Sequence, residues 1–194
     1  FNVEPGTNPG FLYQQNTMRD AIVAGINLNI FNSHADRIVM ANIAQVINVL
    51  QSVILTKKEQ IVLTPTYYVF KMYKVHQGAT MIPVSVTCRD YTLEGKSVPS
   101  ISVSASIDNK GRTHITLVNL DPNAANPVTL NLGLARSMSV TSEVITSKNM
   151  NDFNDFGVAA KVAPAKFDGF KLNGSQLVVN MPAKSVVGLE LILK

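Results

Sequence analysis

The 194-residue chain has no tryptophan, a single cysteine and only three histidines. With Cys88 alone, the chain can form neither an intrachain disulfide framework nor a thiolate metal site. No catalytic-cysteine motif surrounds Cys88, so we expect it in the core or in a half-buried strand. The histidines, His34, His76 and His114, fall in separate segments without the spacing of paired ligands. The sequence therefore gives no support for a bound metal ion.

Charged residues are also scarce, at 15%, and the net charge of +4 is evenly spread. Residues 1–80 carry six basic and four acidic side chains, and residues 81–194 carry eleven and nine. A nucleic-acid-binding surface would concentrate lysine and arginine on one element, so no such partner is expected. The densest basic spot, Lys57 with Lys58, is typical of a solvated turn. No apolar run reaches the roughly 18 residues of a membrane-spanning helix, so no membrane partner is expected either.

Hydrophobic residues make up 46% of the chain, and their spacing changes near Gly78. Residues 12–77 have a helical pattern with one short apolar strand, whereas residues 79–194 alternate with a period of two. The chain is long enough for two small domains with separate cores. We therefore predict two domains, residues 1–78 and residues 79–194.

The first half is predicted to contain two helices. Met18, Ile22, Ile26 and Ile30 recur every fourth residue and would line one face of a helix that ends at His34. Gly25 on that helix either lets another element approach closely or is a tolerated weak point.

A short apolar run at residues 38–44 favours a strand buried on both faces. The second helix should begin with Thr64 as N-cap and Pro65 in the first turn, and it should end at Gly78. Strands and helices in alternation are typical of an α/β barrel.

The second half is predicted to contain eight short strands. The DNKG and NG sequences at residues 108–111 and 173–174 are hairpin signals. The NMNDFNDFG stretch, residues 149–157, is predicted to be a loop, and its aspartates do not have the spacing of an EF-hand. Regular short strands with such turns favour an antiparallel β-sandwich, jelly-roll-like in type. The predicted strands cover residues 81–87, 101–107, 113–119, 128–132, 139–145, 167–172, 176–181 and 185–193.

The opening sequence VEPGTNPGFLYQQNTMRD, residues 3–20, resembles the segment that follows the nucleophile strand in family 51 glycoside hydrolases, the retaining α-L-arabinofuranosidases. Two stretches look like the last helices and the eighth strand of that family's barrel: residues 8–56, from NPGF to VILT, and residues 64–78, TPTYYVFKMYKVHQG. Near the C-terminus, MPAKSVVGLELIL looks like the last strand of the family's sandwich. The resemblance covers essentially the whole chain. It implies an α/β plus all-β fold, in which the C-terminal fragment of a (β/α)8 barrel, residues 1–78, precedes the β-sandwich, residues 79–194.

The same resemblance implies that this chain lacks both catalytic glutamates. In the family the acid/base glutamate lies on an earlier barrel strand, and the nucleophile lies in a DEW-like motif shortly before the VEPG-like segment. The single position that transfers is Gln45, which corresponds to a glutamine that hydrogen-bonds the arabinofuranosyl unit. The end of a barrel strand suits that role, although a glutamine there could instead cap or bridge barrel loops.

The positions of the carboxylates in residues 1–78 agree with the expected absence of a catalytic pair. A retaining glycosidase needs two carboxyl groups about 5 to 5.5 Å apart. Asp20 is expected in the first turn of a helix, and Asp36 and Glu59 are expected in loops. Glu4, between Val3 and Pro5, is the one carboxylate of this half that we consider as a catalytic candidate. The alternative is that Glu4 braces a loop or faces solvent.

A complete barrel takes about 250 residues, so residues 1–78 cannot close one. We therefore expect the apolar helix face at Met18, Ile22 and Ile26, and the run at residues 39–44, to be exposed unless another polypeptide covers them. The missing N-terminal barrel segment or a second chain would be that partner.

Three functions remain open at this stage. The resemblance implies part of a retaining α-L-arabinofuranosidase acting on arabinan or arabinoxylan, inactive alone, free of cofactors and homo-oligomeric in the parent enzyme. A non-catalytic carbohydrate- or protein-binding module is the alternative from another class, although the chain offers few aromatic residues for sugar stacking. A different enzyme built on Glu4 is the third.

Overall fold

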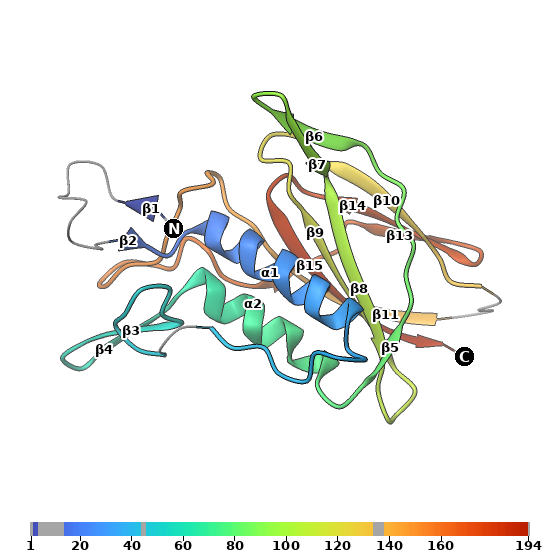
Figure 1. Ribbon diagram of the computed structural model, residues 1–194, viewed down its shortest axis with the longest axis horizontal. Coiled ribbons are helices and arrows are strands. Elements are labelled where there is room, and N and C mark those ends of the chain that lie inside the picture. The colour runs from blue at the N-terminus through green and yellow to red at the C-terminus, as the bar shows by residue number, and fades with distance from the viewer. Residues whose placement is uncertain (1, 4–13, 44–45, 134–137, 194) are drawn as a thin grey trace.

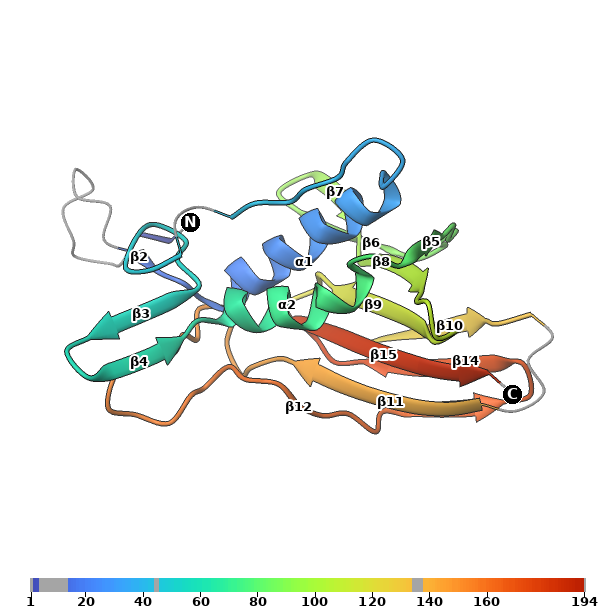
Figure 2. The same cartoon turned by 90° about the horizontal axis from the view of Figure 1, so that it is seen from below.

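The computed structural model describes residues 2–3, 14–43, 46–133 and 138–193. They form three layers, with two helices on one face of a six-stranded sheet and a three-stranded sheet on its other face (Figures 1 and 2). No helix among the described residues has the length and apolar character needed to cross a membrane.

Both predicted helices are present. Helix α1 (Met18–Ser33) ends at His34, as predicted, and helix α2 (Pro65–Tyr73) continues into the short 3-10 helix η1 (Lys74–His76). The Thr64 side chain accepts a hydrogen bond from the Tyr67 N–H, which confirms the predicted N-cap. The two helices lie side by side and run in the same direction (Figures 1 and 2).

The predicted antiparallel sandwich is confirmed, because every strand pair of both sheets is antiparallel. The six-stranded sheet has the order β12-β11-β15-β9-β8-β5 and the three-stranded sheet the order β10-β14-β13. The strands of the first sheet are β5 (Thr80–Ile82), β8 (Ile101–Ile107), β9 (Thr113–Asn119), β11 (Met138–Ile145), β12 (Ala165–Lys166) and β15 (Ser185–Leu193). Those of the second are β10 (Asn126–Asn131), β13 (Phe170–Asn173) and β14 (Gln176–Met181).

Alternation along the central strands divides the apolar residues between two cores. On β9, Ile115 and Leu117 face the three-stranded sheet, whereas Val118 faces the helices. The same holds on β15, where Val187 and Val186 belong to different cores. The six-stranded sheet is therefore covered by apolar contacts on both faces.

The helix face was expected to lack partners, and for Met18 and Ile22 this expectation is wrong. Both side chains are buried, at 0% and 4% exposure, because α1 packs on the outer face of the sandwich. Gly25 makes this approach possible, since a Cβ atom there would lie 2.9 Å from Cγ2 of Val118. Close approach is therefore the role of Gly25.

The predicted strand at residues 38–44 is wrong over its described part, because residues 38–43 form no regular structure. A strand buried on both faces needs neighbouring strands, and no described strand lies beside this run. Val39 and Met40 are 95% and 71% exposed, which agrees with the expected uncovered apolar surface.

Other differences concern local pairing. The predicted strand 81–87 shortens to β5, and the predicted strand 167–172 is replaced by β12 and β13. The loop at residues 149–157 is confirmed, as is the turn at Lys58. Three small antiparallel strand pairs among the described residues were not predicted: β1 (Asn2–Val3) with β2 (Gln14–Gln15), β3 (Ile54–Lys57) with β4 (Gln60–Leu63), and β6 (Asp90–Leu93) with β7 (Lys96–Pro99).

Candidate functional site

The predicted substrate-binding residue, Gln45, lies outside the described residues, as does Glu4. The segment that follows Gln45 is described, and residues 46–53 form a loop that leads into β3. This loop lies at the end of the molecule where α1 and α2 begin (Figure 1). We take it as the described part of the candidate site.

The loop is held in a defined shape by its own hydrogen bonds. The Val46 carbonyl accepts from the N–H groups of Val53 and Ile54, at 3.2 and 3.1 Å. The Asn48 side chain accepts from the Thr56 N–H at 2.7 Å and donates to the Thr56 hydroxyl at 2.8 Å. Asn48 and Gln51 have φ angles of +53° and +58°, a left-handed conformation that costs free energy in residues other than glycine. The surrounding contacts therefore fix this backbone.

Further hydrogen bonds attach the loop to the N-termini of both helices. The Gln51 side chain donates to Asp20 Oδ1 at 2.8 Å. The Asn16 amide donates to the Ser52 carbonyl at 3.0 Å and accepts from the Thr66 hydroxyl at 2.7 Å. The segment after Gln45 is thus braced by Asp20 of α1 and by Asn16, which precedes α1 and is itself held by Thr66 of α2.

The described carboxylates of residues 1–78 cap a helix or lie in exposed turns. Asp20 is buried and its Oδ2 accepts from the Thr17 N–H and hydroxyl, at 2.7 and 2.9 Å. It therefore stabilises the helix start, as predicted from its position. Asp36 and Glu59 are exposed in turns, as predicted.

Among the described residues, a group of ionisable side chains gathers around the hairpin between β8 and β9. Arg112 contacts Asp108 at 2.7 Å and Glu190 at 3.0 Å, and His114 Nε2 lies 3.2 Å from Asp108 Oδ2. Burial raises the pKa of Asp108, but hydrogen bonds from the Arg112 backbone, from His114, from the Arg112 side chain and from the Lys110 backbone outweigh it and lower this pKa. Asp108 is thus paired and ionised at neutral pH, which suits a brace for the β8–β9 hairpin rather than an acid catalyst. Among the described residues, no group of three or more His, Cys, Asp or Glu side chains is placed to hold a metal ion.

A buried polar network joins the helices to the sheet, and nothing in the sequence predicted it. Oδ1 of Asn29 accepts from the hydroxyls of Tyr73, Ser104 and Thr116, at 2.8, 2.8 and 3.0 Å. Its Nδ2 donates to the Ser102 hydroxyl at 3.1 Å. Burial raises the pKa of Tyr73, against the opposing effect of hydrogen bonds with Thr116 and Asn29, so its phenol stays neutral. The network fixes the helices on the sheet through directional contacts.

His76 extends this network from η1. Its Nδ1 lies 2.7 Å from the Ser106 hydroxyl and its Nε2 lies 3.1 Å from the Thr116 hydroxyl. Burial, and then the nearby His114, lowers the pKa of His76 from 6.5 to about 4. The folded chain therefore holds His76 as neutral imidazole over the range in which an unfolded chain would protonate it.

His76 should make the stability of the chain depend on pH. Because its pKa is lower in the folded state, its contribution is complete above about pH 6.5 and declines as pH falls toward 4. Between pH 7.5 and pH 5.0 we expect a loss of about 1 to 2 kcal/mol that His76→Gln does not show. Urea unfolding of both proteins at the two pH values measures it. An identical pH dependence in the variant would contradict the assignment.

The aromatic residues of the sandwich form no exposed stacking surface. Phe167 is buried in the core between the sheets, Phe170 packs against that core, and Phe153, Phe156 and Tyr91 are half-buried. These phenylalanines therefore pack in a core and in a loop. Sugar-binding faces use exposed aromatic rings, so the described surface does not favour a carbohydrate-binding module.

Comparison with known proteins decides the family. Residues 1–185 match the family described as alpha-L-arabinofuranosidase C-terminal domain. The chain belongs to this family. It is 49% identical, over 97% of its length, to an intracellular exo-alpha-L-arabinofuranosidase of Bacteroides ovatus. It also matches the crystal structure of the GH51 arabinofuranosidase from Xanthomonas axonopodis pv. citri, with a TM-score of 0.90 and 42% identity over 97% of the chain. The chain therefore corresponds to the C-terminal domain of family 51 α-L-arabinofuranosidases, which confirms the family that the sequence resemblance implied.

The chain spans only 37% of the Bacteroides enzyme and 38% of the Xanthomonas structure. A GH51 arabinofuranosidase structure from Thermotoga petrophila RKU-1 has the same fold, with a TM-score of 0.79 at 23% identity over 92% of the chain and 39% of that structure. More than half of the arabinofuranosidase polypeptide in these relatives thus has no counterpart in residues 1–194.

Proposed function

We propose that the protein containing this chain is a retaining α-L-arabinofuranosidase that releases terminal non-reducing α-L-arabinofuranosyl residues from arabinan or arabinoxylan. The observation that supports this most is the 49% identity to the Bacteroides enzyme over 97% of the chain. Both catalytic glutamates lie in the part of the enzyme that precedes residue 1. No cofactor takes part, and the parent enzyme is a homo-oligomer, which light scattering of the full-length protein would test.

In this proposal residues 1–78 are the last part of the (β/α)8 barrel, and residues 79–194 are a jelly-roll-like sandwich that braces it. The parallel, adjacent arrangement of α1 and α2 supports the first assignment, since consecutive helices of such barrels run in the same direction around the strands (Figures 1 and 2).

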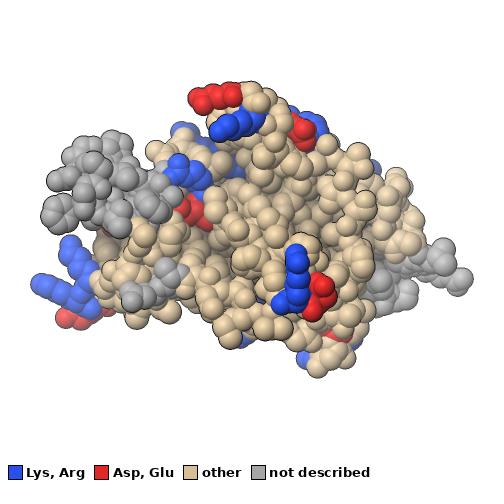
Figure 3. All heavy atoms as spheres, viewed as in Figure 1, with Lys and Arg blue, Asp and Glu red and all other residues tan. Residues whose placement is uncertain are grey.

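The surface over the helices supports the same assignment. The apolar side chains Ile30, Val39 and Met40 are exposed there. Charged side chains on this face are few and scattered (Figure 3). A sparsely charged face with exposed apolar residues is typical of a surface that another segment covers, and the remaining barrel is that segment.

The direct test is incubation of the full-length protein with arabinan and with arabinoxylan, with released arabinose measured by chromatography. Proton NMR of early products reports the anomeric configuration, and we expect retention. A folded full-length protein that releases no arabinose from either polymer, or from a short arabinofuranosyl oligosaccharide, would overturn the proposal.

Gln45 is proposed to hydrogen-bond the arabinofuranosyl unit. In the full-length enzyme, Gln45→Ala should lower kcat/KM for an aryl α-L-arabinofuranoside by about 10- to 100-fold, which is the worth of one or two hydrogen bonds in a closed site. Gln60→Ala, in the exposed part of β4, is the matched control and should change kcat/KM less than about twofold. Equal kinetics for the two variants would show that Gln45 only bridges loops.

A further inference from the structure

Asn16 joins the segment that precedes α1 to the segment that precedes α2. Its Nδ2 donates a hydrogen bond to the Ser52 carbonyl at 3.0 Å, and its Oδ1 accepts one from the Thr66 hydroxyl at 2.7 Å. Ser52 belongs to the loop of residues 46–53, and Thr66 lies in the first turn of α2. One amide group therefore contacts both the loop that follows Gln45 and the helix to which this loop leads.

These contacts lie in the interior of the chain. Asn16 is 8% exposed, and Ser52 and Thr66 are buried. The Thr64 hydroxyl also lies 3.1 Å from the Ser52 carbonyl oxygen. Water does not replace a hydrogen bond that is lost in such a place, so the groups left behind stay unsatisfied unless the backbone moves. The side chains of Asn16, Thr64 and Thr66 therefore fix the distance between the loop and the two helix starts.

Asn16 is itself held on both sides along the chain. It directly follows β2, which pairs with β1 in antiparallel register. The next residue, Thr17, is the N-cap of α1. Asn16 therefore has a fixed position from which to hold the loop.

Both segments lie at the end of the molecule where α1 and α2 begin (Figure 1). In a (β/α)8 barrel, the segment before each helix follows the carboxyl end of a strand, and these segments build the active site. In the proposed barrel, the segment before α1 and the loop before α2 therefore form neighbouring sides of the active site. Asn16 is a direct contact between these two sides.

The loop has a backbone that needs such support. Gln51 has a φ angle of +58°, a left-handed conformation that costs free energy in glutamine and persists where surrounding contacts hold it. The hydrogen bond from Asn16 acts on the next residue, Ser52, and the bond from Gln51 to Asp20 acts on the Gln51 side chain. Loss of the Asn16 contact should therefore let this backbone relax and displace the loop.

We propose that Asn16 is a positioning residue for the hydrolysis of the arabinofuranoside. It acts through Ser52 and Thr66, and it holds the loop of residues 46–53 in the place that the reaction needs. The proposal rests on the proposed function, because it assigns these segments to the active site of an arabinofuranosidase. A displacement of about 1 Å in an active site costs about 10²-fold in rate, so the contact should affect kcat strongly.

Steady-state kinetics of the full-length enzyme on an aryl α-L-arabinofuranoside test this proposal. Asn16→Ala should lower kcat at least about tenfold and change KM less than about threefold, since misplaced groups weaken binding of the transition state most. The melting temperature of each variant is measured in parallel.

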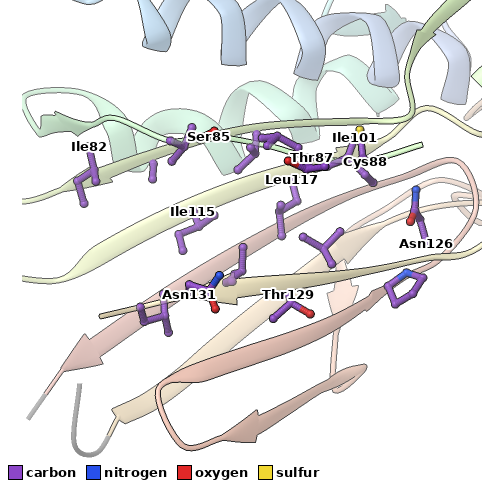
Figure 4. Close-up of a pocket in the computed structure, with 18 of the residues that line it drawn as sticks. Ile82, Ser85, Thr87, Cys88, Ile101, Ile115, Leu117, Asn126, Thr129 and Asn131 are labelled. Atoms are coloured by element: carbon purple, nitrogen blue, oxygen red, sulfur yellow. The ribbon is translucent and has the colours of Figure 1, made fainter. Parts of the chain in front are cut away.

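Asn126→Ala is the matched control. Asn126 is also 8% exposed, and its amide donates to the Ser100 hydroxyl at 2.8 Å. It lines a cavity of the sandwich on the side of the six-stranded sheet that faces away from the helices (Figure 4). Asn126→Ala should lower the melting temperature as Asn16→Ala does, but it should change kcat less than about twofold.

Thr66→Val and Thr66→Ser test the same contact from its other partner. Valine has the shape of threonine but no hydroxyl to donate to Asn16, whereas serine keeps the hydroxyl. We expect Thr66→Val to lower kcat at least about fivefold and Thr66→Ser to stay within about twofold of the wild type. Adding Thr66→Val to Asn16→Ala should lower kcat less than about twofold further, because both changes remove one link.

A fall in kcat of less than about tenfold for Asn16→Ala, an equal fall for Asn126→Ala, or equal kinetics for the two Thr66 variants would overturn the proposal. If Asn16→Ala does not fold, the two Thr66 variants decide alone. A wild-type enzyme that leaves the aryl α-L-arabinofuranoside intact overturns the proposed function together with this proposal. An active wild-type enzyme with unchanged variants overturns this proposal only.

Discussion

The 194-residue chain alone is expected to hydrolyse an aryl α-L-arabinofuranoside at least about 10⁵-fold more slowly than the full-length enzyme. Retaining hydrolysis needs a nucleophilic carboxylate and an acid/base carboxyl group about 5 to 5.5 Å apart, and both precede residue 1 in the proposed enzyme. Removing the nucleophile of a serine protease, which also works through a covalent intermediate, costs about six orders of magnitude in kcat. Asp20 cannot substitute, because its carboxylate is buried and bound to Thr17 and Gln51.

The measurement is a chromogenic assay of the purified chain, with its intact mass confirmed so that no upstream sequence remains. The full-length enzyme, prepared in the same way, is the positive control. Turnover by the chain alone would mean that the catalytic groups lie within residues 1–194. Glu4→Gln would then be the first variant to make, because an essential carboxylate costs several orders of magnitude in rate and a bracing residue does not.

Asn29→Leu is expected to destabilise the chain by about 3 kcal/mol. The amide of Asn29 makes four hydrogen bonds with side chains from α2, β8 and β9, and Asn29 is only 1% exposed. Leucine has a similar size but leaves hydroxyl groups of the sheet with fewer partners in a buried region, which costs about 1 to 3 kcal/mol for each unsatisfied group. Urea-induced unfolding followed by circular dichroism measures the change.

Asn27→Leu is the matched control on the same helix. Asn27 is exposed, and its side chain donates a hydrogen bond to the Val23 carbonyl within α1, so its replacement should change stability by less than about 0.5 kcal/mol. The double variant Asn29→Leu with Ser104→Ala should lose less stability than the two single changes combined, since the two residues share one network. Equal effects of the Asn27 and Asn29 changes would show that the network contributes little.

Much of the fold could be predicted because its signals are local. The bounds of β8, β9, β14 and β15 agree with the predicted strands, since alternation and turn residues lie within a few positions of each other. The helix start at Thr64 was equally readable from a hydroxyl followed by proline.

The fold predictions were wrong where the structure of a segment depends on residues far away in the sequence. A short apolar run such as residues 38–43 has the composition of a buried strand, but only neighbouring strands can make it one. The position of α1 on the sheet was missed because its contacts with β8 join residues that lie 73 and 72 positions apart in the sequence. The loop after Gln45 is braced by Asn16 and Asp20, more than 30 residues earlier in the chain, and no local pattern links them.

The serines of β8 determine how precisely α1 is positioned on the sheet. Apolar contacts tolerate sliding of a helix along a sheet. The hydrogen bonds that Asn29 and Asn32 donate to the Ser102 and Ser104 hydroxyls, and the one that Ser104 donates to Asn29, can form at one position only. A shift of α1 by a single residue along the sheet would break them all at once. The sandwich therefore fixes the position of α1 along the sheet. Through the hydrogen bond between Asp20 and Gln51, it also fixes the position of the loop that follows Gln45.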